Sequence, residues 1–410
     1  MTAERVAGSP AVPRHHREAS KDRRATARRA SRRSAFDSTA SSTSRYVMIG
    51  GFLGAGKTTA VARLAEHLTN RGLRVGLITN DQSTGLVDTA LLRSRGFTVE
   101  EIAGGCFCCR FPSLLEAATR LTAATRPDVF VAEPVGSCTD LLATVSYPLR
   151  RIYGDRFRIA PLSVLVDPTR AARVFGLAAG RSLSSKVIYV YRKQLEEARF
   201  IVINKCDVVA EPLRQQLTEC LQASFPRAEV FCCSAREGQG LAEWFARLHD
   251  DDTPGGPALG LDYDQYADGE ALLGWLNATV RLSGGEPFCA NELLLDLCEG
   301  IRRRLCERDC EIAHLKMTFE AEDGSGQLSV VSIVASDAEP DLRESLLDRV
   351  GEGTLIVNLR AEADPEALRA VTCSELERCV RSAGLRMELE HLDCFRPARP
   401  TPTHRDAATP

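Results

Sequence analysis

One short motif limits what this chain can fold into more than any other feature. The segment Gly51-Phe52-Leu53-Gly54-Ala55-Gly56-Lys57-Thr58 fits the complete P-loop pattern, follows a strand-like apolar run at Tyr46-Val47-Met48-Ile49 and opens a helical pattern that extends to about Arg71. In this setting backbone N–H groups wrap phosphates, and the helix N-terminus favours bound anions. The expected phosphate-binding residues are Gly51, Gly54, Ala55, Gly56, Lys57, Thr58 (which also holds Mg²⁺) and Thr59.

The P-loop requires a parallel sheet, and the apolar pattern supplies one. Short, continuously apolar strands alternate with helical stretches over residues 45–249. The expected strands are Tyr46–Ile49, Arg74–Thr79, Val129–Ala132, Leu162–Val166, Phe200–Ile203 and Glu229–Cys232. We therefore predict an α/β fold: a doubly wound, mostly parallel P-loop sheet, followed by a smaller α+β domain.

Two acidic side chains are expected beside the phosphates. Glu133 follows the strand Val129–Ala132, at a position where many NTPases carry Asp. We expect Glu133 to bind Mg²⁺ or to orient the attacking water. Gly136 follows it and offers an N–H to the γ-phosphate. Asp81 lies where a first switch is expected and is a second candidate for water-mediated Mg²⁺ binding.

A later motif indicates the base. Asn204-Lys205-Cys206-Asp207 matches the guanine-reading N-K-x-D pattern at a strand end, and Asn204 is expected to brace the P-loop. The Asp207 carboxylate can accept from the N1–H and N2 amine of guanine, and adenine lacks both donors. Ser234 and Ala235 follow the next strand, where a backbone N–H meets guanine O6. We predict GTP rather than ATP.

Three thiols lie between the two switch positions. Cys106, Cys108 and Cys109 follow a Gly-Gly turn and precede an expected helix at about Pro112–Ala124, a setting that favours thiolates. Soft thiolates favour Zn²⁺ or related transition metals over Mg²⁺, and three donors leave the shell incomplete. Asp81, Glu101 or Cys138 is expected to complete it. A redox thiol pair and a buried turn are the alternatives.

Together these motifs resemble the CobW family, metal-handling P-loop GTPases related to the HypB and UreG nickel-insertion GTPases. The resemblance rests on Gly51–Thr59, Cys106–Cys109, Glu133–Gly136 and Asn204–Asp207. It implies slow GTP hydrolysis, a transition metal (zinc or cobalt) at the cysteine motif, and delivery to a client metalloprotein. It also allows a homodimer.

Two departures limit what the resemblance carries over. The family commonly has Glu-Asn-Glu-Phe-Gly after the second strand, where this chain has Thr79-Asn80-Asp81-Gln82-Ser83, so a glutamate ligand from that segment is not transferred. The chain also has no His-rich stretch. His314 is expected to face solvent on a half-buried strand, on which Ala313, Leu315, Met317 and Phe319 face a core.

The remaining segments are assigned from composition. Residues 1–44 form a basic tail that we expect to be disordered, since residues 1–45 carry eleven basic side chains against four acids and lack apolar periodicity. A misplaced start codon and a targeting or nucleic-acid-binding arm are the alternatives. We expect a linker at 250–269, a C-terminal α+β domain at 270–394 and a disordered tail at 395–410.

Charge and hydropathy exclude some classes of protein. No apolar run approaches 18 residues, so no membrane helix is expected, and the acidic body argues against a nucleic-acid partner. The chain has fifteen cysteines but no export signal, which suggests a cytoplasmic protein with reduced thiols. Cysteines outside the motif are expected to pack in the core. A second site at Cys298, Cys306 and Cys310 is the alternative for those three.

The resulting functional prediction is a GTP-hydrolysing metallochaperone. Two alternatives stay open at this point: a GTPase that activates or protects a cobalamin-type enzyme without metal transfer, and a switch protein regulated by its thiols. Only six residues are lysine, and two of them, Lys57 and Lys205, fall inside nucleotide motifs.

Overall fold

The computed structural model describes residues 43–81, 87–251 and 256–406. Gln82 and Ser83 of the expected first switch, and the basic tail up to residue 42, lie outside the described residues. Thr43–Pro410 forms one compact unit. In the described part of the chain no helix combines the length and apolar character that a membrane span needs.

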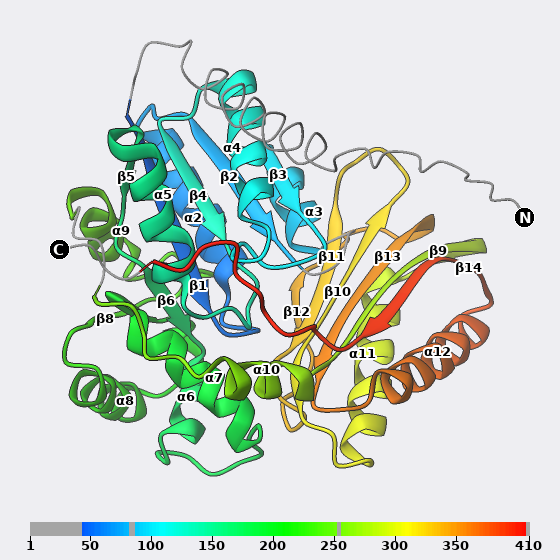
Figure 1. Cartoon of the computed structure of the whole chain (residues 1–410). Coiled ribbons are helices and arrows are strands. Elements are labelled where there is room, and N and C mark those ends of the chain that lie inside the picture. The colour runs from blue at the N-terminus through cyan, green and yellow to red at the C-terminus, as the bar shows by residue number, and fades with distance from the viewer. Residues whose placement is uncertain (1–42, 82–86, 252–255, 407–410) are drawn as a thin grey trace, which may run out of the picture. The chain divides into compact units, whose positions relative to one another are not determined.

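The first part of the chain forms the predicted parallel sheet (Figure 1). Its strands are β1 (Ser44–Gly51), β2 (Val75–Asn80), β3 (Val99–Ile102), β4 (Val129–Glu133), β5 (Phe157–Ile159), β6 (Ser163–Val166), β7 (Phe200–Ile203) and β8 (Glu229–Cys232). The order is β3-β2-β4-β1-β6-β7-β8, with β5 also paired to β1, and every described pair is parallel. The strand order reverses at β1, so ligands are expected beyond its carboxyl end, where the P-loop begins.

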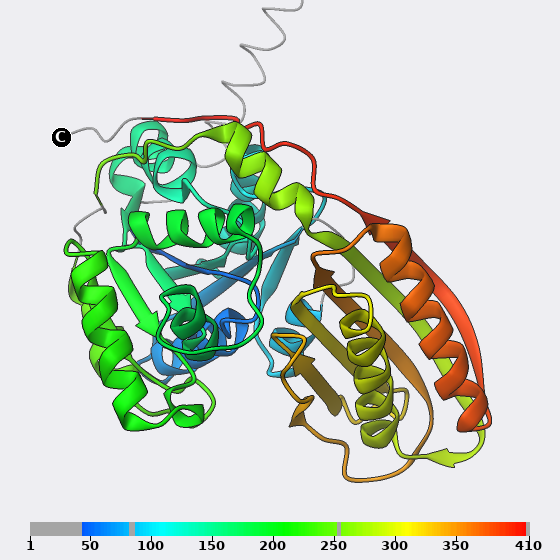
Figure 2. The same cartoon turned by 90° about the horizontal axis from the view of Figure 1, so that it is seen from below.

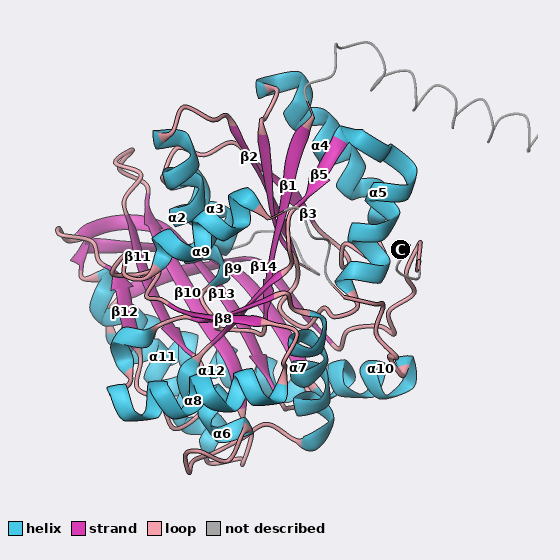
Figure 3. Ribbon diagram, turned by 90° about the vertical axis from the view of Figure 1, so that its left-hand side faces the viewer, coloured by secondary structure: helices cyan, strands magenta, loops and turns pink. Residues whose placement is uncertain are grey.

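Helices connect these strands, and Figure 3 shows them in cyan around the magenta strands. They are α2 (Lys57–Asn70), α3 (Val87–Ser94), α4 (Phe111–Thr125), α5 (Tyr147–Tyr153), α6 (Pro168–Val174), α7 (Ser185–Glu197), α8 (Glu211–Ser224) and α9 (Leu241–Asp250). Small alanine and valine side chains on α2 let it pack closely on β1 and β4, and Trp244 of α9 is fully buried in the same core.

The second part forms an antiparallel sheet of order β12-β11-β10-β13-β9-β14. Its elements are α10 (Tyr263–Leu272), β9 (Gly274–Phe288), α11 (Ala290–Cys306), β10 (Ile312–Ala321), β11 (Leu328–Ile333), β12 (Asp341–Glu344), β13 (Val350–Ala361), α12 (Pro365–Ser382) and β14 (Leu385–Phe395). Figure 2 shows α11 and α12 over one face of this sheet. The apolar stripe of α11 and alternate residues of β9, β10 and β13 form that core.

Two expected boundaries differ from the structure. Helix α10 occupies the end of the expected linker, because the Asp262 side chain caps it by accepting from the N–H groups of Asp264 and Gln265. Residues 396–406, which we expected to be disordered, are placed against the parallel-sheet part (red in Figure 1). Charged and polar side chains hold that segment against distant residues. Amino-acid composition alone does not predict such tertiary contacts.

Candidate functional site: a P-loop cavity and a thiol cluster

The loop between β1 and α2 has the tight backbone that a P-loop needs. Gly56 caps α2 in the left-handed region with φ of 88°, and a Cβ there would lie 2.4 Å from the Asn204 side-chain amide. Asn204 itself donates to the Ala55 carbonyl at 2.8 Å, so its predicted bracing contact is confirmed. Lys57 is buried and donates to the Phe52 carbonyl at 3.4 Å. The loop is therefore held by its own backbone and by Asn204, the residue that follows strand β7.

The Thr58 hydroxyl lies between two carboxylates. Its Oγ1 is 2.7 Å from Asp88 Oδ1 and 3.1 Å from Glu133 Oε1. The second Glu133 oxygen is buried and makes no hydrogen bond among the described residues. Burial, followed by the charge of Asp88, raises the pKa of Glu133 to about 8. An unsatisfied buried carboxylate beside a threonine hydroxyl is a donor set that suits a hard divalent cation.

Asp88 is a site residue that lies outside the sequence motifs. It lies in the first turn of α3, just after the undescribed residues 82–86, and belongs to no recognisable pattern. Burial opposes its ionisation, but the charge of Lys316 and hydrogen bonds from Lys316 and Thr58 outweigh burial and lower its pKa. The predicted Asp81 lines the same cavity, but its carboxylate pairs with Arg360 at 3.1 Å.

The base-reading residues gather around a second, adjoining cavity. Asp207 is exposed at this cavity, which Asn204, Lys205 and Ala235 also line. Lys205 donates to the Gly54 carbonyl at 2.7 Å and to Asp167 at 2.8 Å. The Ala235 N–H donates to the Asn204 side chain at 2.9 Å, so the N–H that we expected to meet guanine is engaged by the motif itself. Ser234 is fully buried, and its hydroxyl accepts from the Glu237 N–H.

The second sheet closes the phosphate cavity. The outer faces of β10, β12 and β13 carry Lys316, Arg343 and Arg360 to its wall, together with His314. The expectation that His314 faces solvent is wrong, because this face of the sheet packs on the nucleotide site. Burial, and then the charge of Lys316, lower the pKa of His314 well below its ordinary value.

The three motif thiols form a cluster just before α4. The sulfur atoms of Cys106, Cys108 and Cys109 all lie within 4.8 Å of one another, and Cys106 Sγ is 3.3 Å from Cys109 Sγ. Cys106 and Cys108 are buried, and Cys109 is half-buried. Hydrogen bonds from the surrounding thiols, Cys108 first, lower the pKa of Cys106 well below its ordinary value. The cluster can therefore supply a thiolate.

Of the three residues that we expected as a further ligand, Cys138 contacts the cluster through a hydrogen bond to Cys106. It is fully buried, and its thiol shares a hydrogen bond with Cys106, which together with burial raises the pKa of Cys138. Asp81 is paired with Arg360, and Glu101 on β3 is not part of the described group of potential metal ligands. Cys138 follows Gly136 by two residues, so it belongs to the loop after Glu133.

The C-terminal segment covers part of this cluster. The Thr401 N–H donates to Cys109 Sγ at 3.3 Å, and the Thr403 N–H donates to the Cys108 carbonyl at 2.8 Å. The Thr403 hydroxyl donates to the Cys109 carbonyl at 3.0 Å. Arg405 anchors the segment by pairing with the buried Asp140 at 2.7 Å. We call residues 396–406 the C-terminal strap.

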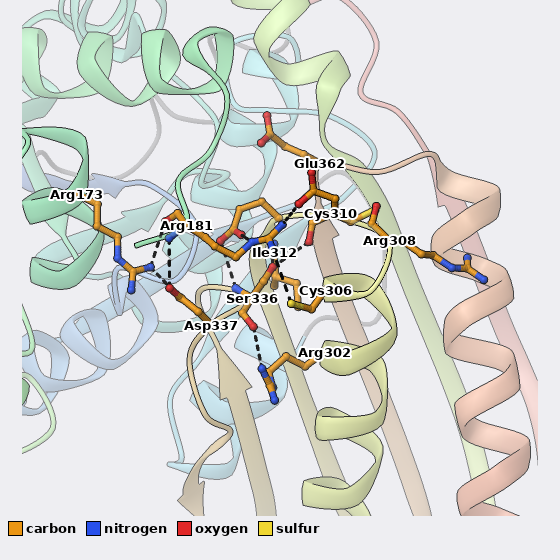
Figure 4. Close-up of polar contacts among 12 residues, drawn as sticks. Arg173, Arg181, Arg302, Cys306, Arg308, Cys310, Ile312, Ser336, Asp337 and Glu362 are labelled. Atoms are coloured by element: carbon orange, nitrogen blue, oxygen red, sulfur yellow. Dashed lines mark hydrogen bonds and ion pairs between the residues drawn. The ribbon is translucent and has the colours of Figure 1, made fainter. Parts of the chain in front are cut away.

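The alternative second cysteine site has another role in the structure. Figure 4 shows Arg181 reaching toward Cys306 near Cys310. Arg181 donates to Glu311 at 3.1 Å and approaches Cys306 Sγ at 3.9 Å. Cys298 is buried in the core under α11, where burial raises its pKa. The positive charge of Arg181 beside these groups disfavours a bound cation. Among the described residues, the group of three potential metal ligands that lie close together is Cys106, Cys108 and Cys109.

Comparison with known proteins agrees with the arrangement of these motifs. Residues 45–232 match the model of the family described as CobW/HypB/UreG, nucleotide-binding domain. A zinc-regulated GTPase metalloprotein activator from Dictyostelium discoideum is 26% identical over 214 residues, covering 45% of this chain and 44% of that protein. The zinc chaperone YeiR of Escherichia coli strain K12 is 29% identical over 177 residues, covering 42% and 50%.

Among solved structures, the hydrogenase maturation factor HypB from Archaeoglobus fulgidus is 22% identical, covering 54% of this chain and 96% of its own, with a TM-score of 0.37. The chain spans about half the length of the curated relatives that it matches. Residues 45–232 therefore form a domain similar to the nucleotide-binding domain of the CobW/HypB/UreG family.

Proposed function

We propose that this protein is a GTP-hydrolysing metallochaperone that binds a transition metal at Cys106, Cys108 and Cys109 and couples its transfer to a client metalloprotein with GTP hydrolysis. Zinc is the first candidate metal, since the two relatives described above are named for zinc, and cobalt is the second. The client, the cytoplasmic location and a homodimer remain part of this proposal.

One contact carries the proposal: Asn80 holds the cysteine loop at the end of a switch strand. Its Oδ1 accepts from the Phe107 N–H at 2.9 Å, and its Nδ2 donates to the carbonyls of Ile102 and Gly105. The next residue, Asp81, lines the phosphate cavity. A movement of this strand end on GTP binding would therefore change the geometry of the thiols.

Each predicted nucleotide residue has a role in this proposal. The phosphates would be cradled by Gly51, Gly54, Ala55, Gly56 and Thr59. Lys57 would neutralise their charge, and Gly136 would offer an N–H. The base site would be formed by Asn204, Lys205, Asp207, Ser234 and Ala235. Thr58, Glu133 and Asp88 would hold Mg²⁺, which supplies charge neutralisation to the phosphates when bound. Asp81 would contribute from the second sphere.

We propose Cys138 as the fourth metal ligand. A thiolate there would connect the metal to the loop that carries Gly136, and so to the second γ-phosphate sensor. Cys138 lies outside the set of mutually close sulfur atoms, so this ligand requires a small closing movement. Three or four soft thiolates suit Zn²⁺ or Co²⁺.

A redox function is the second candidate, because the 3.3 Å separation of Cys106 Sγ and Cys109 Sγ brings two thiols close enough to oxidise after a small shift. Metal analysis of anaerobically purified protein separates the two. One bound zinc per chain supports the metallochaperone, and metal-free protein with a reversible Cys106–Cys109 disulfide supports the thiol switch.

Cobalt titration tests the ligand set. Thiolate-to-cobalt charge-transfer absorption should appear in the wild type, disappear in Cys106→Ser and weaken in Cys138→Ser. Cys373→Ser, in α12 and remote from the cluster, is the matched control and should leave the spectrum unchanged. Loss of binding in Cys106→Ser together with an unchanged spectrum in Cys138→Ser would remove Cys138 from the site and leave the three-thiol site intact.

A further inference from the structure

The second sheet contributes positive charge to a cavity that is built around a P-loop. Four cationic and three carboxylate side chains line the cavity, and three of the four cations come from strands of the second sheet. These cations are Lys57, Lys316, Arg343 and Arg360. A surplus of cations around a P-loop suits a polyanionic phosphate chain.

Lys316 shares a carboxylate partner with the predicted metal-binding hydroxyl of Thr58. Its Nζ lies 2.6 Å from Asp88 Oδ1, and that same oxygen lies 2.7 Å from Thr58 Oγ1. The ammonium is therefore within two hydrogen-bond lengths of the Thr58 hydroxyl. In P-loop enzymes this hydroxyl helps to hold the phosphate-bound metal, so an ammonium this near to it would be able to meet the terminal phosphate.

Burial makes the placement of Lys316 informative. The side chain is 9% exposed, and a buried ammonium is costly unless it is paired. The strand neighbours Leu315 and Met317 pack into the apolar core on the other face of the sheet, so they do not pair with the Lys316 charge. Asp88 pairs with Lys316 and also accepts a hydrogen bond from the Thr58 hydroxyl, the group that a metal would need.

Arg360 has a different character. Its guanidinium donates to the Leu276 carbonyl and to Asn277, and it lies 4.0 Å from the centre of the Trp275 ring. These contacts fix it in place, and Asp81 is held against it. Arg360 therefore anchors Asp81, the expected switch residue. Lys316 instead has a flexible side chain, and a phosphate can replace its ion-pair partner Asp88.

We propose that Lys316 is a ligand of the terminal phosphate, supplied to the P-loop by the second sheet of the same chain, and that it exchanges Asp88 for this phosphate when GTP binds. This inference rests on the proposed GTPase function and assigns a phosphate-recognising role to a domain that carries no nucleotide motif. The exchange would release Asp88 and Thr58 together, so the arrangement of the second sheet would report whether a third phosphate is present. GDP offers no such partner.

The test measures the affinities of the full-length chain for a non-hydrolysable GTP analogue and for GDP by calorimetry, with Mg²⁺. One charge-assisted contact corresponds to a loss of roughly 10- to 100-fold. Lys316→Met should lose this much affinity for the GTP analogue and less than about threefold for GDP. Lys186→Met removes an exposed lysine on α7 and should change neither affinity.

The conservative variant Lys316→Arg should keep most of the preference for the GTP analogue. If Lys316→Met does not fold, Lys316→Gln removes the charge but retains an amide donor for Asp88. Equal losses for GTP analogue and GDP, or no loss for either, would overturn the inference. A wild-type chain that binds no GTP analogue would instead overturn the proposed function, so the two failures are distinguishable.

Discussion

Asn80 Oδ1 accepts a hydrogen bond from the Phe107 N–H at 2.9 Å, which ties the end of β2 to the middle of the cysteine motif. The same side chain donates to the carbonyls of Ile102 and Gly105. One buried amide thus binds the end of β3 and two backbone groups of the loop that carries the thiols, beside the phosphate cavity.

Asn80→Ala should therefore weaken metal binding without removing a ligand. Buried backbone groups left without partners cost about 1–3 kcal/mol each, so the loop should lose its fixed geometry and zinc affinity should fall by roughly 10- to 100-fold. Competition with a chromogenic chelator measures this. Asn291→Ala is the matched control, because Asn291 braces Leu346 in the second domain in the same way. Equal zinc affinities in the two variants would contradict this account.

A buried carboxyl that accepts a hydrogen bond from the Leu142 N–H predicts a pH dependence of stability. Burial raises the pKa of Glu197 to about 8, so the folded state keeps a proton that the unfolded state releases above its ordinary pKa of 4.5. The stabilisation is complete below about pH 4.5 and is lost as pH rises to about 8, at up to about 1.4 kcal/mol per pH unit.

Glu197→Gln should remove this dependence. The difference in unfolding free energy between wild type and variant should move in favour of the variant from about pH 5 to about pH 8, and stay constant above that range. Urea unfolding at several pH values measures it. Glu196→Gln changes the half-exposed neighbour and should give a difference that does not vary in this way. A pH-independent difference for Glu197→Gln would show that the carboxyl is ionised in the folded protein.

The C-terminal strap should slow access to the thiols. The N–H groups of Thr401 and Thr403 and the Thr403 hydroxyl donate to Cys108 and Cys109, and Arg405 fixes the strap to Asp140. A chain ending after Arg396 should react faster with a thiol reagent at Cys109 and release zinc faster to a chelator. A chain ending after Asp406 retains the described strap and is the control. Identical rates for both chains would show that the strap does not protect the site.

Guanine selectivity should depend on Asp207. The carboxylate is exposed at the base cavity, and its loss should reduce the ratio of GTP to ATP affinity by roughly one to two orders of magnitude. Glu219→Ala removes an exposed acid from α8 and should leave the ratio unchanged. An unchanged ratio in Asp207→Ala would assign base recognition to other residues.

The sequence predicts the parallel sheet and its motifs because the information there is local. The P-loop glycines, the apolar strands and N-K-x-D each occupy a few consecutive residues, and the structure has the strands that they require. The short strands β3 and β5 were not predicted, since each has few residues and mixed polarity.

The residues that sequence reasoning missed meet through tertiary contacts. Asp88 and Lys316 are 228 positions apart, and neither local sequence predicts that the two side chains pair. In the sequence Lys316 alternates with the apolar residues Leu315 and Met317, a pattern that indicates a solvent-facing position. The strap was misread because a proline- and arginine-rich composition resembles disorder, while its contacts depend on Asp140 and the cysteine loop.

The central claim is that the nucleotide and the metal are coupled, and one measurement tests it most directly. The zinc affinity of the wild-type chain is determined by chelator competition with a non-hydrolysable GTP analogue, with GDP and without nucleotide, in the presence of Mg²⁺. The account predicts that zinc affinity differs at least about fivefold between the GTP-analogue and GDP forms, with a reciprocal change in nucleotide affinity. Zinc affinities that agree within about twofold in all three forms, while Cys106→Ser abolishes binding, would contradict it.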